Sequence, residues 1–102
     1  MFTVSASIIE LLILSIVNRK DSYGYDISQR IKMASEIKES TLYPILKKMN
    51  KSGYLESYIE NYNGRARKYY KITEQGKAHL AEMRSEWDRF VSTIELIGGK
   101  NE

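Results

Sequence analysis

The chain has 102 residues, of which 42% are hydrophobic, and it carries a formal net charge of +3. A chain of this length is expected to form one domain around a small core, which association with a second copy would help to stabilise. It contains no cysteine, so disulfides and thiolate metal sites are excluded, as suits a reducing compartment. The sequence shows no signal-peptide pattern, and we expect a cytoplasmic protein.

Residues 5–18 are apolar on nearly every side of the helix they predict. The run from Ile8 to Val17 is interrupted by Glu10 and has about half of the roughly 20 residues needed to cross a bilayer, so no membrane span is expected. A helix that is apolar all round must be buried on more than one side. We therefore expect one side to face the core and another to face a partner.

A second helix is predicted to begin at a cap formed by Asp21 or Ser22 and to end near Met33. Its apolar positions, Tyr23, Ile27 and Ile31, recur every four residues. Gly24 falls inside this helix, where glycine costs about 1 kcal/mol relative to alanine. A close approach by the first helix would explain the glycine.

A third helix is predicted from an apolar stripe with helical spacing, formed by Leu42, Ile45, Leu46 and Met49. Ser40 or Thr41 would cap it, which would place Pro44 in the first turn, and Gly53 would follow its end. The lysines at positions 47, 48 and 51 would then lie on the outer face.

A β-hairpin follows, because Asn63-Gly64 is the strongest signal for a two-residue turn of type I′. A turn of that length predicts four cross-strand pairs: Glu60 with Arg67, Tyr58 with Tyr69, Glu56 with Lys71, and Leu55 with Ile72. These pairs join opposite charges or apolar and aromatic side chains, as a stable register should.

The last predicted helix begins at a Thr73 cap, runs from Glu74 to about Ile97 and ends at Gly98-Gly99. Its apolar residues follow alternating steps of three and four, the seam of a coiled coil: Leu80, Met83, Trp87, Phe90, Ile94 and Ile97. The seam is too short to specify a coiled coil alone. We expect it to pair with the first helix of a second subunit in a homodimer.

This order of elements predicts a mainly α (α+β) fold, a winged helix-turn-helix with a long C-terminal helix. Residues 1–73 would form the DNA-binding domain and residues 74–102 the dimerisation helix. Positive charge is concentrated on the third helix and the hairpin, since residues 38–71 hold eight basic against three acidic side chains. The rest of the chain holds eight against ten. One basic face favours a polyanion, and double-stranded DNA is the predicted partner.

The predicted DNA contacts lie at the start of the third helix, one turn further on, and on the hairpin, which is the wing of this fold. They are Ser40, Thr41, Tyr43, Lys47, Lys48, Arg65, Arg67 and Lys68. Other roles are open for some of them: Tyr43 as a packing aromatic under the wing, Lys48 as a solvated lysine, and Arg67 as the partner of Glu60. Tyr69 and Tyr70 are expected to be structural strand residues.

Three segments resemble successive signatures of the PadR family of bacterial transcriptional regulators. They are Tyr23-Gly24-Tyr25-Asp26-Ile27, the run from Thr41-Leu42-Tyr43-Pro44 to Lys48, and the run from Arg67-Lys68-Tyr69-Tyr70 to Gly76. The resemblance implies a dimeric winged-helix repressor that binds a pseudo-palindromic operator. Ser40 is a departure, because the family commonly has glycine at that position.

Trp87, the only tryptophan, lies at the middle of the predicted dimer seam. It is expected either to be an interface core residue or to bind a ligand. The second reading comes from the resemblance, because a multidrug-binding family member holds flat aromatic compounds between such tryptophans. It implies an effector site in which Glu10, Leu11, and either Asp88 or the nearby Glu86 join Trp87.

The sequence lacks the patterns of an enzyme: an activated nucleophile, a glycine-rich phosphate loop, or a carboxylate pair with a neighbouring base. His79 is the lone histidine and has no cysteine or second histidine with which to share a metal. No cofactor is expected. The alternative function is a protein-interaction module that uses the winged-helix scaffold without binding DNA.

Overall fold

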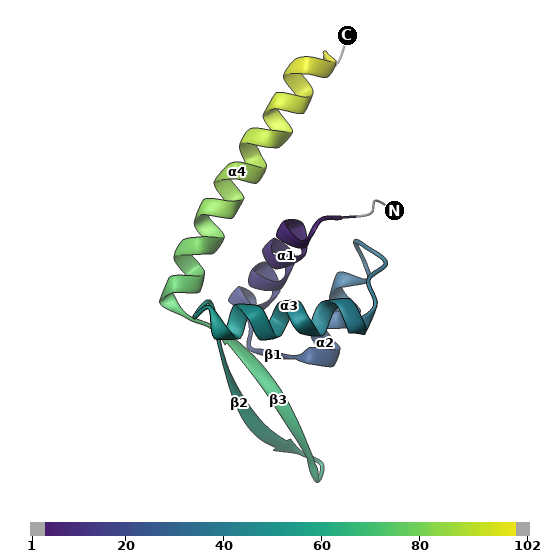
Figure 1. Ribbon diagram of the computed structural model, residues 1–102, viewed down its shortest axis with the longest axis vertical. Coiled ribbons are helices and arrows are strands. Elements are labelled where there is room, and N and C mark those ends of the chain that lie inside the picture. Colours follow the sequence, from purple (N-terminus) through teal and green to yellow (C-terminus); the bar gives the residue numbers. More distant parts are fainter. Residues whose placement is uncertain (1–3, 100–102) are drawn as a thin grey trace.

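The computed structural model describes residues 4–99, and over these residues the chain forms four helices and three strands. In chain order they are α1 (Ala6–Arg19), β1 (Ser22–Tyr23), α2 (Gly24–Ile31), α3 (Glu39–Lys51), β2 (Leu55–Tyr62), β3 (Arg65–Ile72) and α4 (Glu74–Gly98). Helices α1, α2 and α3 form a body from which the hairpin and α4 project in opposite directions (Figure 1). The molecule is therefore elongated, at 58 × 28 × 20 Å. The predicted winged-helix fold is confirmed.

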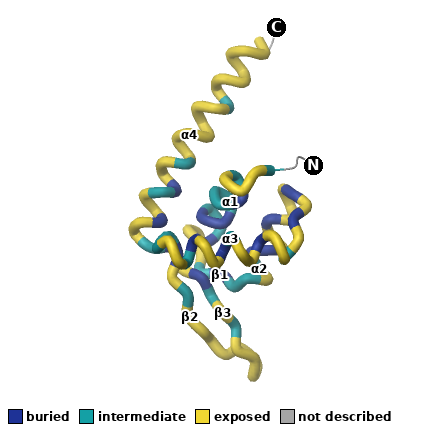
Figure 2. The backbone as a smooth tube through the Cα atoms, viewed as in Figure 1, coloured by how far each residue is buried: buried dark blue, intermediate teal, exposed yellow. Residues whose placement is uncertain are grey.

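The core lies between the three body helices and the base of the hairpin (Figure 2). Ile13 and Leu14 of α1, Ile27 of α2, and Leu42 and Leu46 of α3 are all completely buried. Burying each such side chain contributes roughly 1.5–3 kcal/mol. The predicted stripes of α2 and α3 face the core, although Ile45 is only partly buried.

Helix α2 starts later than the sequence predicted. Ser22 and Tyr23 form the short strand β1, which pairs with Tyr70 and Tyr69 of β3 and makes the sheet order β1-β3-β2. Gly24 is consequently the first residue of α2. The prediction that the first helix approaches this glycine was wrong: a Cβ there would lie 3.0 Å from Cε1 of Tyr43, on α3.

Helix α3 starts earlier than predicted, because Lys38 and not Ser40 or Thr41 occupies its N-cap. The Glu39 carboxylate accepts hydrogen bonds from Ser28 Oγ at 3.1 Å and from Lys32 Nζ at 3.3 Å, which fastens this end of α3 to α2. Pro44 therefore lies beyond the first turn, inside the helix, where it removes one hydrogen bond. Gly53, with φ of 88°, follows the helix end as predicted.

The hairpin has the predicted register in full, from Leu55 opposite Ile72 to Glu60 opposite Arg67. Asn63 and Gly64 form its turn with φ of 51° and 78°, the positive values that a type I′ turn requires. Tyr70, Ile72 and Leu55 bury the base of the hairpin in the core, while its outer half is exposed. We call the hairpin of β2 and β3 the wing.

Helix α4 begins as predicted, since Thr73 Oγ1 accepts a hydrogen bond from the Gly76 amide at 2.9 Å. Its first turns pack on α1, with Gly76 and Leu80 buried. Beyond them the helix leaves the body, so the predicted seam becomes progressively exposed (Figure 2). Gly99, with φ of 70°, caps its end. The ends of the predicted domains, residues 1–3 and 100–102, lie outside the described residues.

Candidate nucleic-acid interface

The exposed face of α3 carries three of the predicted DNA contacts. Ser40, Tyr43 and Lys47 are spaced by three and four residues, so they share one side of the helix, and all three are exposed. Ser40 is in the first turn, where helix amides and the positive end of the helix dipole favour phosphate. This side of α3 is suited to an anionic partner.

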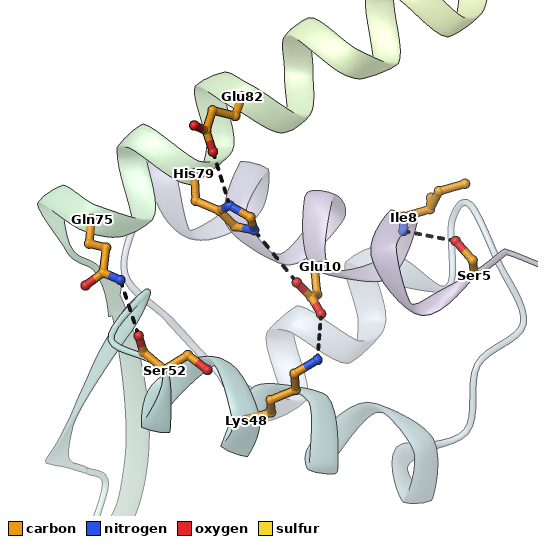
Figure 3. A network of polar contacts seen from close by, with 8 residues as sticks. All are labelled: Ser5, Ile8, Glu10, Lys48, Ser52, Gln75, His79 and Glu82. Carbon is orange, nitrogen blue, oxygen red and sulfur yellow. Dashed lines mark hydrogen bonds and ion pairs between the residues drawn. The ribbon is translucent and has the colours of Figure 1, made fainter.

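Thr41 and Lys48 lie on a different side of α3, the side turned toward α1. Thr41 borders a cleft that it shares with Val4, Ala6 and Ile9. The Nζ of Lys48 lies 3.6 Å from Glu10 Oε2 on α1 (Figure 3). Lys48 therefore joins two helices of the body, a role that neither the DNA-contact reading nor the solvated reading of this residue included.

Glu10 links three helices through its two oxygens. Besides Lys48 of α3, it faces His79 of α4, whose Nε2 lies 4.0 Å from Glu10 Oε1 (Figure 3). The His79 ring stacks on Tyr54 at 4.2 Å between centroids, and its Nδ1 lies 3.8 Å from Glu82. The Glu10 side chain is only 14% exposed. Sequence reasoning assigned Glu10 to the effector site, but here it lies against Lys48 of α3 and His79 of α4.

The wing presents different side chains on its two faces, because side chains alternate along each strand. Lys68 lies on the same face of β3 as Tyr70 and Ile72, which enter the core. Arg67 lies on the other face, where its guanidinium carbon is 4.4 Å from the ring centroid of Tyr23 and 4.3 Å from that of Tyr62. Within residues 4–99, no ion pair joins Arg67 to Glu60, although the two residues are opposite in register.

A cleft of about 530 Å³ separates the wing from α3. Tyr43 and Lys47 contribute from α3, and Ala66, Arg67, Lys68 and Tyr70 from the wing. The remaining lining residues are Tyr23, Gly24 and Tyr25. Three cations and four tyrosines thus surround one groove, a combination suited to phosphate groups and their sugar backbone.

Arg65 is the first residue after the turn, opposite Tyr62, and it is exposed. It therefore lies at the outer end of the wing, the end that projects away from the body (Figure 1). The structure therefore leaves Arg65 available to a large partner.

A second, more apolar cleft of about 190 Å³ lies between α1 and α4. Its lining comprises Ser7, Ile8, Leu11, Met83, Glu86, Trp87 and Phe90. Two of the predicted effector residues, Leu11 and Trp87, are in this lining, whereas Glu10 and Asp88 are not. Of the two carboxylates that the sequence offered for this site, Asp88 and Glu86, only Glu86 is in the lining.

Comparison with known proteins decides the family. The model of the "Transcriptional regulator PadR-like family" matches residues 13–82. The chain is a PadR-like transcriptional regulator. The resemblance of its three sequence segments to this family is thereby confirmed.

Solved structures agree with this PadR-like assignment. The chain is 52% identical to the protein smu.1704 of Streptococcus mutans, with a TM-score of 0.92 over 99% of this chain and 96% of that one. It is 37% identical to a PadR family transcription regulator of Clostridium difficile, with a TM-score of 0.82 over 89% and 98%. It is also 39% identical to an uncharacterized protein X of Lysinibacillus sphaericus, over 87% of this chain and 86% of that one.

The PadR family consists of regulators rather than enzymes, in agreement with the lack of catalytic patterns in the sequence. Within residues 4–99 of this PadR-like chain, no group of three or more histidine and acidic residues is arranged to hold a metal ion. The same residues contain no helix long and apolar enough to cross a membrane.

Sequence reasoning missed the residues that attach the wing to the body of this PadR-like chain. The Tyr58 hydroxyl donates a 2.8 Å hydrogen bond to Asp21 Oδ2, and this bond raises the pKa of Tyr58 to about 12. The Tyr69 ring lies between those of Tyr23 and Tyr58, at 5.5 and 5.6 Å. A signal was present, because Tyr58 and Tyr69 were predicted as a cross-strand pair, but their partners at positions 21 and 23 were assigned to a helix start.

Proposed function

We propose that this regulator is a homodimeric repressor that binds a pseudo-palindromic operator in double-stranded DNA. Helix α3 enters the major groove with Ser40, Tyr43 and Lys47 toward the DNA, and the wing follows the adjacent backbone through Lys68 and Arg65. It works in the compartment that holds the chromosome, the cytoplasm. Residues 1–73 act as the DNA-binding domain, and the helix from residue 74 onward as the dimerisation element.

The observation that carries this proposal is the groove between α3 and the wing. Lys47 and Lys68 line it from opposite walls, and the α3 face beside it is exposed and polar. Lysines on both walls of a groove concentrate positive potential where a phosphate chain would lie. Thr41 and Lys48, which are turned toward α1, are secondary candidates for the DNA contact.

The dimer part of the proposal rests on α4. Along its seam the exposed fraction is 40% at Trp87, 56% at Phe90, 53% at Ile94 and 81% at Ile97. Several large apolar side chains in one stripe are costly to leave in water, and the stripe continues from the buried Leu80. A second copy of the chain is the occupant with matching chemistry, because its α1 and α4 present half-buried and exposed aliphatic side chains of their own.

An electrophoretic mobility-shift experiment with the region upstream of the protein's own gene tests DNA binding. Repeating it at two salt concentrations separates specific from purely electrostatic binding, since each phosphate contact makes affinity fall with salt. We expect a shifted band that survives the higher salt with this DNA and is lost with unrelated DNA. Absence of a shift with either DNA would favour the alternative, a protein-interaction module on the same scaffold.

The cleft beside Trp87 favours a second part of the proposal, control by a flat aromatic effector. The Trp87 and Phe90 rings are 6.1 Å apart, and Glu86 beside them would favour a cationic compound. Binding there would change the angle between the two C-terminal helices and hence the spacing of the two recognition helices, whose half-sites lie about one turn apart. Quenching of Trp87 fluorescence by flat aromatic cations, together with a changed operator affinity, is the expected result. If the dyes leave the fluorescence unchanged, Trp87 is an interface residue only.

A further inference from the structure

Within residues 4–99, Arg67 is the outermost residue of β3 that makes a cation–π contact with the body. The base of the wing is held by core packing, by a 3.0 Å hydrogen bond from Asn50 Nδ2 to Ser57 Oγ, and by the pairing of β1 with β3. Further out, the Asp21–Tyr58 hydrogen bond and the tilted rings of Tyr23 and Tyr69, 5.5 Å apart, follow. Arg67 contacts the body at a point closer to the tip of the wing than any of these residues.

The Arg67 guanidinium lies between two rings from different parts of the molecule. Tyr23 belongs to β1, which leads into α2, and Tyr62 belongs to the outer end of the wing. Both centroids are within the distance of about 6 Å at which a cation is attracted to a ring face. The planar guanidinium can stack in this way, whereas the compact ammonium of lysine does so less well.

A two-stranded hairpin with an exposed outer half needs such an attachment to hold one direction, because an isolated hairpin is only marginally stable in water. The direction matters here, since Lys68 and Ala66 form one wall of the groove and Tyr43 and Lys47 form another. A wing that rotates about its base would vary the width of this groove, and DNA binding would then first have to order the wing.

We propose that Arg67 is a positioning residue: stacked between Tyr23 and Tyr62, it fixes the angle of the wing against α3 and so the width of the groove that takes the DNA backbone. The effect of Arg67 on DNA binding rests on the proposed function, whereas its effect on the angle of the wing is a property of the free protein. Arg65 and Lys68 make the phosphate contacts, and Arg67 acts through them.

Wing motion in the free protein is the first measurement. Backbone ¹⁵N relaxation at Gly64 and Arg65 reports the motion of the tip in the wild type, Arg67→Ala, Arg67→Lys and Lys68→Ala. We expect faster and wider motion of the tip in both Arg67 variants and no change in Lys68→Ala. Tyr23→Leu, which removes the ring on the body side, should reproduce the Arg67 result, and circular dichroism checks that each variant is folded. Wild-type tip motion in folded Arg67→Ala would overturn the proposal.

The salt dependence of DNA binding is the second measurement, made by fluorescence anisotropy with a labelled mixed-sequence duplex. The slope of log affinity against log salt is negative, and loss of one phosphate contact reduces its magnitude by about 0.9. We expect Lys68→Ala to reduce the magnitude by that amount, and Arg67→Ala to weaken binding about fivefold to tenfold with the slope unchanged. Arg67→Lys should behave like Arg67→Ala, although it keeps the charge.

The two proposals fail in different ways. If Arg67→Ala reduces the magnitude of the slope as Lys68→Ala does, or if Arg67→Lys binds like the wild type, Arg67 is a phosphate contact and the positioning role is wrong. If the wild type binds no DNA, the proposed function fails, and the relaxation measurement still decides whether Arg67 fixes the wing.

Discussion

At the scale of single residues, Tyr58 provides a titration that reports on the attachment of the wing. Its hydrogen bond to Asp21 raises its pKa to about 12, from an ordinary value of 10.0. The neutral phenol is the form that the fold favours, so this bond contributes stability below pH 10 and loses that contribution as the pH rises through 12. Burial raises the pKa of Tyr70 as well. In an ultraviolet titration of the eight tyrosines, we expect Tyr58 and Tyr70 to ionise after the others.

Removing the acceptor should isolate the Tyr58 signal. In Asp21→Ala the pKa of Tyr58 should return toward 10, because the hydrogen bond to Asp21 is the largest cause of its shift. Asp26→Ala is the matched control, since Asp26 pairs with Arg30 at 3.5 Å on α2 and not with a tyrosine. An unchanged late ionisation in Asp21→Ala would show that the bond is not what delays Tyr58.

Arg65 is the residue whose DNA contact can be tested most directly. We expect Arg65→Ala to weaken binding to every sequence. The magnitude of the slope of log affinity against log salt should fall by about 0.9, as loss of one phosphate contact predicts. Arg84→Ala removes an exposed arginine from α4, a helix that projects away from the wing (Figure 1), and serves as the control. Anisotropy titrations over a range of salt give both slopes. An Arg65→Ala slope equal to that of the wild type would count against the contact.

At the scale of elements, the junction between the wing and α4 depends on Gly76. A Cβ at this position would overlap the Tyr54 carbonyl oxygen and lie 2.8 Å from Cγ1 of Ile72, so α4 could not keep its place against the wing base. We expect Gly76→Ala to lower the free energy of unfolding by about 1–3 kcal/mol, the usual cost of overpacking.

Gly98 offers a matched control for that substitution on the same helix. A Cβ at Gly98 meets no atom within 4 Å, so Gly98→Ala should change the free energy of unfolding by less than about 0.5 kcal/mol. Urea denaturation of the two variants measures the difference. If both behave like the wild type, α4 shifts to accept the methyl group more easily than the packing indicates.

At the scale of the whole molecule, the exposed seam of α4 predicts the oligomeric state. Light scattering at micromolar concentration should give the mass of a dimer for the wild type. Ile94→Asp places a charge in the seam and should give a monomer, because burying an unpaired carboxylate costs several kcal/mol. Ser92→Asp adds the same charge on another side of the helix and should leave the dimer intact. A monomeric wild type would reject the dimer.

Much of the fold could be predicted from the sequence, because the responsible interactions are local. Apolar spacing placed the core faces of α2 and α3, Thr73 marked the start of α4, and Asn63-Gly64 fixed the register of the wing. The register follows once a two-residue turn is assumed, since each cross-strand pair is then set by counting. Strand β1 was missed because two residues carry no period of their own.

The sequence by itself therefore determined the four helices, the hairpin, their order, the family signatures and the concentration of positive charge on α3 and the wing. Tertiary structure decided which neighbours each of those charges has. It turned Lys48 toward Glu10 and placed Arg67 between Tyr23 and Tyr62, while Lys47 and Lys68 line the groove. The physical reason is that helical and strand periods fix which side chains share a face, whereas partners from distant elements depend on how those elements pack.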